Sequence, residues 1–192
     1  MKLILATNNR HKLKEVSLVL TKNIELLSLA DINFSGEIPE DQDTLEGNAS
    51  QKSHYIFDKF GRDCFADDTG LEIEALDGKP GVYSARYAGE GCSFVDNMEK
   101  VLQEMVGLEN RSARFRTVIS LIIDGKEMQF EGTVEGEMLA QMAGDEGFGY
   151  DAIFRPKGYD QSFAEMPLSE KNTISHRARA VAKLSEYLNQ HF

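Results

Sequence analysis

The chain has 192 residues, and its 21 Lys and Arg against 32 Asp and Glu give a formal net charge of −11. This acidity argues against a general nucleic-acid binder and against a polybasic membrane-surface protein, because both bind anionic surfaces through a basic face. The composition, 41% hydrophobic and 28% charged, is typical of a globular protein, and the length suits one domain.

The cysteines and apolar runs predict a cytoplasmic protein. Cys64 and Cys92 lie far apart and match no zinc or redox motif, so we expect reduced thiols. The apolar run from Leu3 to Ala6 is too short for a signal peptide, and the run over 118–123 is too short to cross a bilayer.

The first third of the chain predicts alternating strands and helices. A short apolar run at 3–6 predicts a strand, helical spacing follows it, and a second strand is expected within 23–29. The acidic stretch 31–51 has no Lys or Arg, and a helix is predicted over 44–60 with Asp43 or Thr44 as its cap. The strand at 64–66 then delivers Asp67-Asp68-Thr69-Gly70 at its tip.

In the rest of the chain the predicted elements change from a helix to a pair of strands and then back to a helix. A turn at 78–81 precedes a predicted helix over 94–106. Two strands, 114–123 and 128–138, flank Asp124-Gly125, a strong hairpin signal. After a glycine- and aromatic-rich loop at 146–154, one helix is expected with a single apolar face made of Ile174, Ala178, Val181, Leu184 and Leu188. The pattern predicts a single domain over 1–192 made of two lobes that share one sheet.

The loop between the first strand and the first helix is a candidate phosphate site. It reads Thr7-Asn8-Asn9-Arg10-His11-Lys12, and a helix N-terminus offers backbone N–H groups and a positive dipole end. It lacks the Gly-x-x-x-x-Gly-Lys pattern of a P-loop. The alternative is a polar helix cap followed by solvated basic residues.

Asp67 and Asp68 are candidate metal ligands. Adjacent carboxylates at a strand tip can hold Mg²⁺, and one of them can accept a proton from water. Glu40, or else Asp41 or Asp43, could supply a further ligand. The competing interpretation is an ordinary solvated turn, and the residues alone leave both open.

Two further segments could contact a nucleotide. Gly147-Phe148-Gly149-Tyr150-Asp151 offers aromatic faces for stacking on a base and a carboxylate for hydrogen bonds, or else a turn that packs on the core. The segment from 171 onward is cationic in an acidic chain, which predicts an anion clamp or else a solvated helix face; it contains Lys171, Ser175, His176, Arg177, Arg179 and Lys183.

Together these segments describe a nucleotide site, and the chain resembles the inosine triphosphate pyrophosphatase family, the XTP/dITP diphosphatases. The resemblance runs nearly end to end through six ordered blocks: Thr7-Asn8-Asn9 through Lys12, Glu46-Gly47-Asn48-Ala49 with Lys52, 66–71, 80–89, 147–151, and Glu170-Lys171-Asn172 with Ser175-His176-Arg177. It implies an α/β fold with a long bent mixed sheet flanked by helices, two lobes with a central cleft, a homodimer and dependence on Mg²⁺.

The resemblance also implies residue roles. Asp68 looks like the residue that activates water, and Glu40, Asp68 and the nearby Asp67 look like metal ligands. The implied substrate contacts are Thr7, Asn8, Asn9, Arg10, His11, Lys12, Lys52, Thr69, Phe148, Gly149, Tyr150, Asp151, Lys171, His176 and Arg177. Thr69 stands where the family more often has Ser.

The resulting prediction is a Mg²⁺-dependent hydrolase that converts ITP, dITP or XTP to the monophosphate and pyrophosphate. Donors from His176, Arg177 and the backbone near Phe148 would favour a 6-oxo purine over a 6-amino purine. The alternatives are a pyrophosphatase for other modified nucleotides, a nucleotide sensor without turnover, and a nucleic-acid binder that uses 171–183. The acidic remainder of the chain disfavours the last of these.

Overall fold

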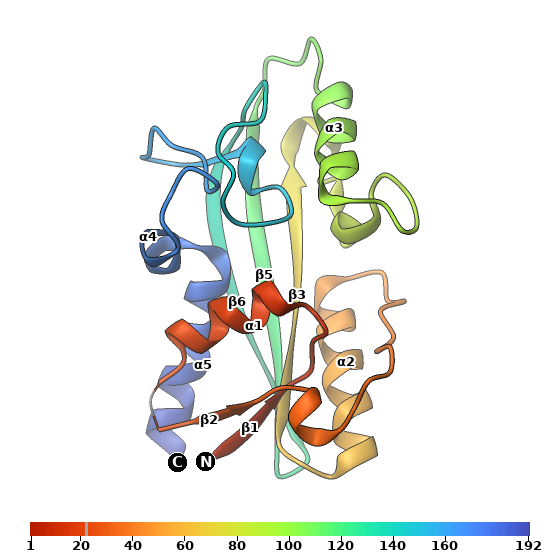
Figure 1. The fold of residues 1–192 in the computed structure, drawn as a ribbon, viewed down its shortest axis with the longest axis vertical. Coiled ribbons are helices and arrows are strands. Elements are labelled where there is room, and N and C mark those ends of the chain that lie inside the picture. Colours follow the sequence, from red (N-terminus) through yellow and green to blue (C-terminus); the bar gives the residue numbers. More distant parts are fainter. Residues whose placement is uncertain (22) are drawn as a thin grey trace. The chain divides into compact units, whose positions relative to one another are not determined.

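The structure is a computed structural model that describes residues 1–21 and 23–192. Its strands are β1 (Lys2–Leu5), β2 (Glu25–Leu27), β3 (Cys64–Ile73), β4 (Pro80–Gly81), β5 (Ser112–Ile123), β6 (Lys126–Met138) and β7 (Phe154–Pro156). Its α-helices are α1 (Arg10–Val19), α2 (Leu45–Phe60), α3 (Phe94–Glu104), α4 (Leu168–Ile174) and α5 (His176–His191) (Figure 1). Short 3-10 helices cover Ala30–Ile32, Glu74–Leu76, Ser84–Arg86 and Asp151–Ile153.

The described strands form one mixed seven-stranded sheet in the order β2-β1-β3-β5-β6-β7, with β4 added beside β3. β1 pairs in parallel with both β2 and β3, whereas β3 pairs antiparallel with β4 and β6 antiparallel with β7. The predicted α/β class with a mixed sheet flanked by helices is therefore confirmed.

The chain divides into two compact units. Unit 1 comprises 1–68, 117–132 and 177–192, and unit 2 comprises 69–116 and 133–176. β3, β5 and β6 contribute residues to both units. The prediction of a single domain over 1–192 stays a prediction.

In unit 1 the sheet is covered by helices on both faces. Alternate residues of a strand point to opposite faces, so Leu3 and Leu5 pack with Val16 of α1 and Leu184 of α5 in one core cluster. Ile4 and Ala6 belong to a second cluster that includes Ile56 of α2. Both faces of β1 are therefore apolar, as expected for a strand buried between helices.

Unit 2 has its own apolar core beside the outer parts of β3, β5 and β6. Met98 and Val101 of α3 pack there with Phe115 of β5 and Phe154 of β7. The loop after β6 also contributes to this core, and Tyr150 is only 3% exposed.

Two details of the sequence prediction are wrong. Asp67-Asp68-Thr69-Gly70 lie inside β3 and not at its tip, because the strand continues to Ile73. In this continuation Leu71 pairs with Gly81 of β4. The predicted C-terminal helix is interrupted: α4 ends at its cap Ser175, Ile174 packs against the core of unit 2, and α5 begins at His176. No helix among the described residues is long and apolar enough to span a membrane.

Candidate functional site

The predicted phosphate loop is held by its own side chains. Asn9 caps α1, and its Oδ1 accepts hydrogen bonds from the backbone N–H groups of His11 (2.9 Å) and Lys12 (3.2 Å). The N–H of Asn9 in turn donates to Oγ1 of Thr7 at 3.1 Å, and Asn8 Nδ2 donates to the carbonyl of Gly36 at 3.2 Å. The loop is thus shaped as a capped turn, while the side chains of Arg10 and His11 are exposed.

Asp67 joins three distant segments of unit 1. Its carboxylate accepts from Lys12 Nζ of α1 at 3.1 Å and from Arg177 Nε of α5 at 3.2 Å. Arg177 also pairs with Glu15, which lies one helical turn after Lys12. Asp67, Arg177 and Glu15 are all less than 5% exposed, so a folded chain must keep their charges paired.

Asp68 lies in a second group, around Lys52 of α2. Lys52 Nζ is 2.8 Å from Asp68 Oδ1 and 2.7 Å from Glu40 Oε1. The other oxygen of Asp68 accepts from Asn48 Nδ2 at 3.2 Å, and Asn48 Oδ1 accepts from the backbone N–H of Gln42 at 2.9 Å. Asn48 and Lys52 are one turn apart on α2, so one helix face orients Asp68 and holds the segment that carries Glu40.

We call the set Lys12, Glu15, Glu40, Lys52, Asp67, Asp68 and Arg177 the ionic cluster. Within it the two adjacent aspartates differ in pKa. Burial raises the pKa of Asp68 above its ordinary value, although Lys52 and Lys12 oppose the rise. Burial acts on Asp67 in the same sense, but Lys12 and Arg177 outweigh it and hold its pKa well below the ordinary range. Asp67 therefore stays ionised, while Asp68 is the better proton acceptor.

The donor set of the ionic cluster fits a hard divalent cation. Two carboxylate oxygens, from Glu40 and Asp68, already converge on one positive centre, Lys52 Nζ. The cluster contains four carboxylates but three cations. Among the described residues no group of three or more His, Cys, Asp or Glu could hold a metal ion alone. Mg²⁺ is commonly bound by one or two carboxylates together with water and substrate phosphate, which agrees with this set.

A second group of predicted residues lies in unit 2. Lys171 is 2% exposed, and its Nζ donates to Asp151 Oδ2 at 2.7 Å. Asp151 Oδ2 also accepts from the backbone N–H of Phe148 at 2.8 Å. The same ammonium lies 5.1 Å from the ring centre of Phe148 and 5.5 Å from that of Phe163, within the range of cation–π attraction.

His176 lies on an aromatic surface of unit 2. Its imidazole is 3% exposed and stacks on the ring of Phe115, with ring centres 4.6 Å apart and an interplanar angle of 18°. The ring of Phe163 is 6.3 Å away. Phe163 thus neighbours both His176 and Lys171. We call Phe115, Phe148, Asp151, Phe163, Lys171 and His176 the aromatic cluster.

Three further predicted substrate contacts, Tyr150, Gly149 and Thr69, differ from one another in burial and surroundings. Tyr150 is buried in the core, and its hydroxyl donates to the carbonyl of Ser84 at 2.8 Å. This hydrogen bond anchors the loop, and a contact of Tyr150 with substrate stays a prediction. Gly149 has a positive φ of 65° and open space around it, whereas Thr69 is half-buried and follows Asp68 directly along β3.

The sequence prediction gave no role to four residues that lie in or beside the ionic cluster and the aromatic cluster: Glu15, Asn48, Phe115 and Phe163. Glu15 carried a usable signal, an acid beside Val16 on the apolar face of α1, three residues after Lys12. Asn48 lies in a block that was part of the resemblance, but its two hydrogen bonds depend on the approach of α2 to β3. Phe115 and Phe163 looked like ordinary core residues, and only their stacking links them to polar groups.

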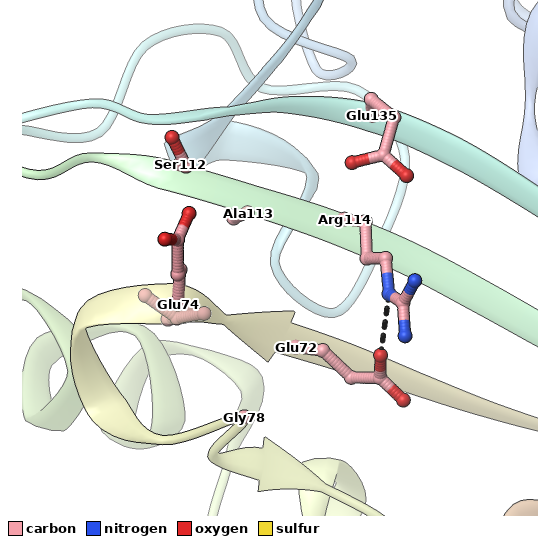
Figure 2. A pocket seen from close by; sticks show the side chains of 8 residues that line it. Glu72, Glu74, Gly78, Ser112, Ala113, Arg114 and Glu135 are labelled. Atoms are coloured by element: carbon pink, nitrogen blue, oxygen red, sulfur yellow. Dashed lines mark hydrogen bonds and ion pairs between the residues drawn. The ribbon is translucent and has the colours of Figure 1, made fainter.

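A separate cavity in unit 2 contains none of the predicted residues. It has a volume of about 300 Å³ and is lined by Glu72, Ile73, Glu74, Gly78, Ser112, Ala113, Arg114 and Glu135. Figure 2 shows Arg114 directed toward Glu72, to which its Nε donates at 2.6 Å, with Glu135 on the neighbouring strand. Three of its polar lining residues are carboxylates, and two of these, Glu74 and Glu135, are exposed, whereas most of the ionic cluster is buried.

Comparisons with known proteins agree with the arrangement of these segments. The model of the Ham1 family matches residues 3–187. A dITP/XTP pyrophosphatase of Flavobacterium johnsoniae is 52% identical over 98% of both chains, and one of Porphyromonas gingivalis is 50% identical over 97% of both. Among solved structures, the Ham1 protein of Staphylococcus aureus superposes with a TM-score of 0.90 at 34% identity over the full length of both chains. A HAM1 protein of Coxiella burnetii gives 0.91 at 34% identity over 99% of both. The predicted family is confirmed: this chain belongs to the Ham1 family.

Proposed function

We propose that this chain is a Mg²⁺-dependent hydrolase that converts dITP, ITP or XTP to the nucleoside monophosphate and pyrophosphate. The observation that carries the proposal is the pair of adjacent carboxylates, Asp67 and Asp68, whose pKa values are shifted in opposite directions beside three cations. Full-length relatives named dITP/XTP pyrophosphatase support the same substrate class.

In the proposed reaction a water molecule attacks the α-phosphorus. A bond forms from the water oxygen to that phosphorus, and the bond to the oxygen bridging the α- and β-phosphorus breaks, so pyrophosphate leaves. Asp68 accepts the water proton, for which its raised pKa suits it. Asn48 and Lys52 each bind one oxygen of Asp68 and so fix the carboxylate plane.

The cations of the ionic cluster are assigned to the triphosphate. Lys12 and Lys52 carry positive charge on α1 and α2, and Lys171 of the aromatic cluster is a third candidate contact. Mg²⁺, when bound, would supply charge neutralisation on phosphate oxygens, with Glu40 and Asp68 as its protein ligands. Asp67, held by two cations, keeps Lys12 and Arg177 in place and is a nearby carboxylate, not a direct ligand.

The aromatic cluster is assigned to the base. Phe148 supplies a half-buried ring suited to stacking, and Asp151 fixes both the backbone of Phe148 and the ammonium of Lys171. A donor from His176 to the 6-oxo group would discriminate against adenine, because the amino group of adenine cannot accept that hydrogen bond. We also propose that the chain forms a homodimer, which light scattering coupled to gel filtration would test. Its proposed location is the cytoplasm.

The decisive experiment is a panel of ITP, dITP, XTP, GTP and ATP with products separated by anion exchange. From ITP, dITP and XTP we expect one pyrophosphate for each monophosphate formed. We expect much slower turnover of ATP. Release of orthophosphate and a diphosphate would contradict the site of attack. Tight binding without any product would instead establish a nucleotide sensor. Turnover of another modified nucleotide, with none of ITP, dITP or XTP, would establish a pyrophosphatase for a different substrate class.

A further inference from the structure

The imidazole of His176 needs an external support to keep one orientation. Rotation of an imidazole about its last side-chain bond has broad, shallow minima, so the bond itself does not fix the ring plane. The ring is nevertheless nearly parallel to that of Phe115, at 18° and 4.6 Å between centres. A stacked face of this kind restricts rotation, because turning the imidazole would drive its edge into the ring below.

Phe115 is itself held rigidly in the core of unit 2. It is 5% exposed, and the ring of Phe154 meets it edge to face at 4.7 Å between centres. Phe163 lies 6.2 Å from it at an angle of 26°. Phe115 also belongs to β5, a strand inside the sheet, so its backbone is fixed as well. His176 therefore rests on a side chain that is much less free to move than a loop residue would be.

The same aromatic surface positions a second polar group. Phe163 lies beside His176 and 5.5 Å below the ammonium of Lys171, which is bonded to Asp151. Packed rings contact both the imidazole and the ammonium, and Asp151 binds the ammonium. Because Phe115 stacks on the imidazole and the Lys171–Asp151 pair does not include it, we expect a change in Phe115 to act mainly on His176.

We propose that Phe115 is a positioning residue for base selectivity, which fixes the plane of the His176 imidazole so that its N–H meets a 6-oxo purine in one geometry. The inference rests on the proposed function, since it concerns how His176 selects the base. Phe115 does not touch the substrate in this account; it acts through His176.

A double-mutant cycle tests this dependence. The measured quantity is the ratio of kcat/KM for ITP to that for ATP in the wild type, Phe115→Leu, His176→Ala and the double variant. Leu keeps most of the apolar volume but has no ring face. We expect Phe115→Leu to lower the ratio about three- to tenfold, the range that an aromatic contact of this kind is worth. In the His176→Ala background the same substitution should leave the ratio unchanged.

Phe34→Leu is the matched control. It removes a buried ring that meets other rings by its edge in a core cluster of unit 1, so it should lower Tm without lowering the ratio. An equal fall in Phe34→Leu, or a fall for Phe115→Leu that persists without His176, would overturn the inference. If His176→Ala leaves the ratio unchanged, the proposed role of His176 fails first. If His176→Ala lowers it and Phe115→Leu does not, only the role of Phe115 fails.

A second measurement does not depend on the stability of any core variant. In the wild-type protein the ring protons of His176 lie over an aromatic face, so their NMR signals should be shifted upfield from those of an exposed histidine. His176→Gln assigns them by their disappearance. Signals at the position of an exposed histidine would show that the stack does not form in solution and would overturn the inference.

Discussion

At the scale of single residues, the chemistry depends on the difference between Asp67 and Asp68. The two carboxyl groups are neighbours on β3, yet alternate strand residues point to opposite sides. Asp67 therefore meets Lys12 and Arg177, whereas Asp68 meets Asn48 and Lys52. Different partners, and not different chemistry, place Asp67 in a buried ion pair and make Asp68 the proposed proton acceptor.

Asp68→Asn should reduce kcat by a factor of about 10² to 10⁴, the usual contribution of a general base. Lys52 keeps its pairing with Glu40, so the fall in Tm should be smaller than for Asp67→Asn, and Asp58→Asn on the exposed face of α2 is the control. In the wild type the base must be ionised, so activity rises with pH through the pKa of Asp68. An Asn variant with near-normal turnover would rule Asp68 out as the base.

Asp67→Asn should act mainly on stability. Removing one partner of a buried ion pair costs about 3–5 kcal/mol, since Lys12 and Arg177 lose their shared carboxylate. The folded pKa of Asp67 is depressed, so its contribution is present above the unfolded value and is lost as pH falls toward the folded one. Urea unfolding at pH 7 and again below pH 3.8 should show the gap between variant and wild type narrowing in acid. A constant gap would contradict the pairing.

At the scale of elements, the loop that carries Phe148 and Asp151, the proposed base-binding residues, depends on one glycine. Gly147 has φ at +79°, and a Cβ there would overlap the carboxylate oxygen of Asp151 that binds Lys171. Gly149 also has a positive φ, +65°, but no neighbour near its missing Cβ. A comparison of substitutions at Gly147 and Gly149 therefore distinguishes the effect of backbone strain from that of steric overlap.

Gly147→Ala should destabilise the protein more than Gly149→Ala. Both substitutions pay the left-handed backbone strain of about 1–2 kcal/mol, but only the first displaces Asp151. We therefore expect Gly147→Ala to raise KM for ITP as well, while Gly149→Ala lowers Tm with KM nearly unchanged. Thermal unfolding and steady-state kinetics on the pair check this; equal KM values would show that Asp151 tolerates the shift.

At the scale of the whole molecule, the charge of −11 is distributed in a way that its average conceals. Lys12, Lys52 and Arg177 lie far apart in the sequence, yet all three enter the ionic cluster of unit 1. An acidic protein can thus bring several cations together at one place without forming a basic surface. The cluster still holds one more carboxylate than cation, which agrees with the proposed need for Mg²⁺ beside a triphosphate.

Removal of the metal should abolish turnover. After exhaustive EDTA treatment and gel filtration we expect loss of pyrophosphate release from ITP, restored by Mg²⁺ in a saturable manner. Glu40→Gln should raise the Mg²⁺ concentration needed for half-maximal activity, because one of the two ligands loses its charge. Glu37→Gln, the same substitution at an exposed acid of the same stretch, is the control. Full activity in EDTA would exclude the proposed dependence on Mg²⁺.

The sequence by itself determined the order of the longer helices and strands, because each of these depends on local patterns, whereas β4, β7 and the break between α4 and α5 were not predicted. Alternating apolar residues, the Thr44 cap of α2 and the Asp124-Gly125 turn are all readable within a few residues. It also identified Asp67, Asp68, Lys12 and most other members of the two clusters, through blocks whose spacing resembles one family.

Only the tertiary structure decided what those residues contact. Asp67-Asp68 were expected at a strand tip, but β3 continues past them to Ile73, and the alternation of strand residues turns their side chains to different partners. The break between α4 and α5 separates Lys171 from Arg177, and the stack under His176 depends on Phe115, which lies 61 residues earlier in the chain. Such contacts join residues remote in sequence, and their energies depend on burial and partner charge, which no local pattern encodes.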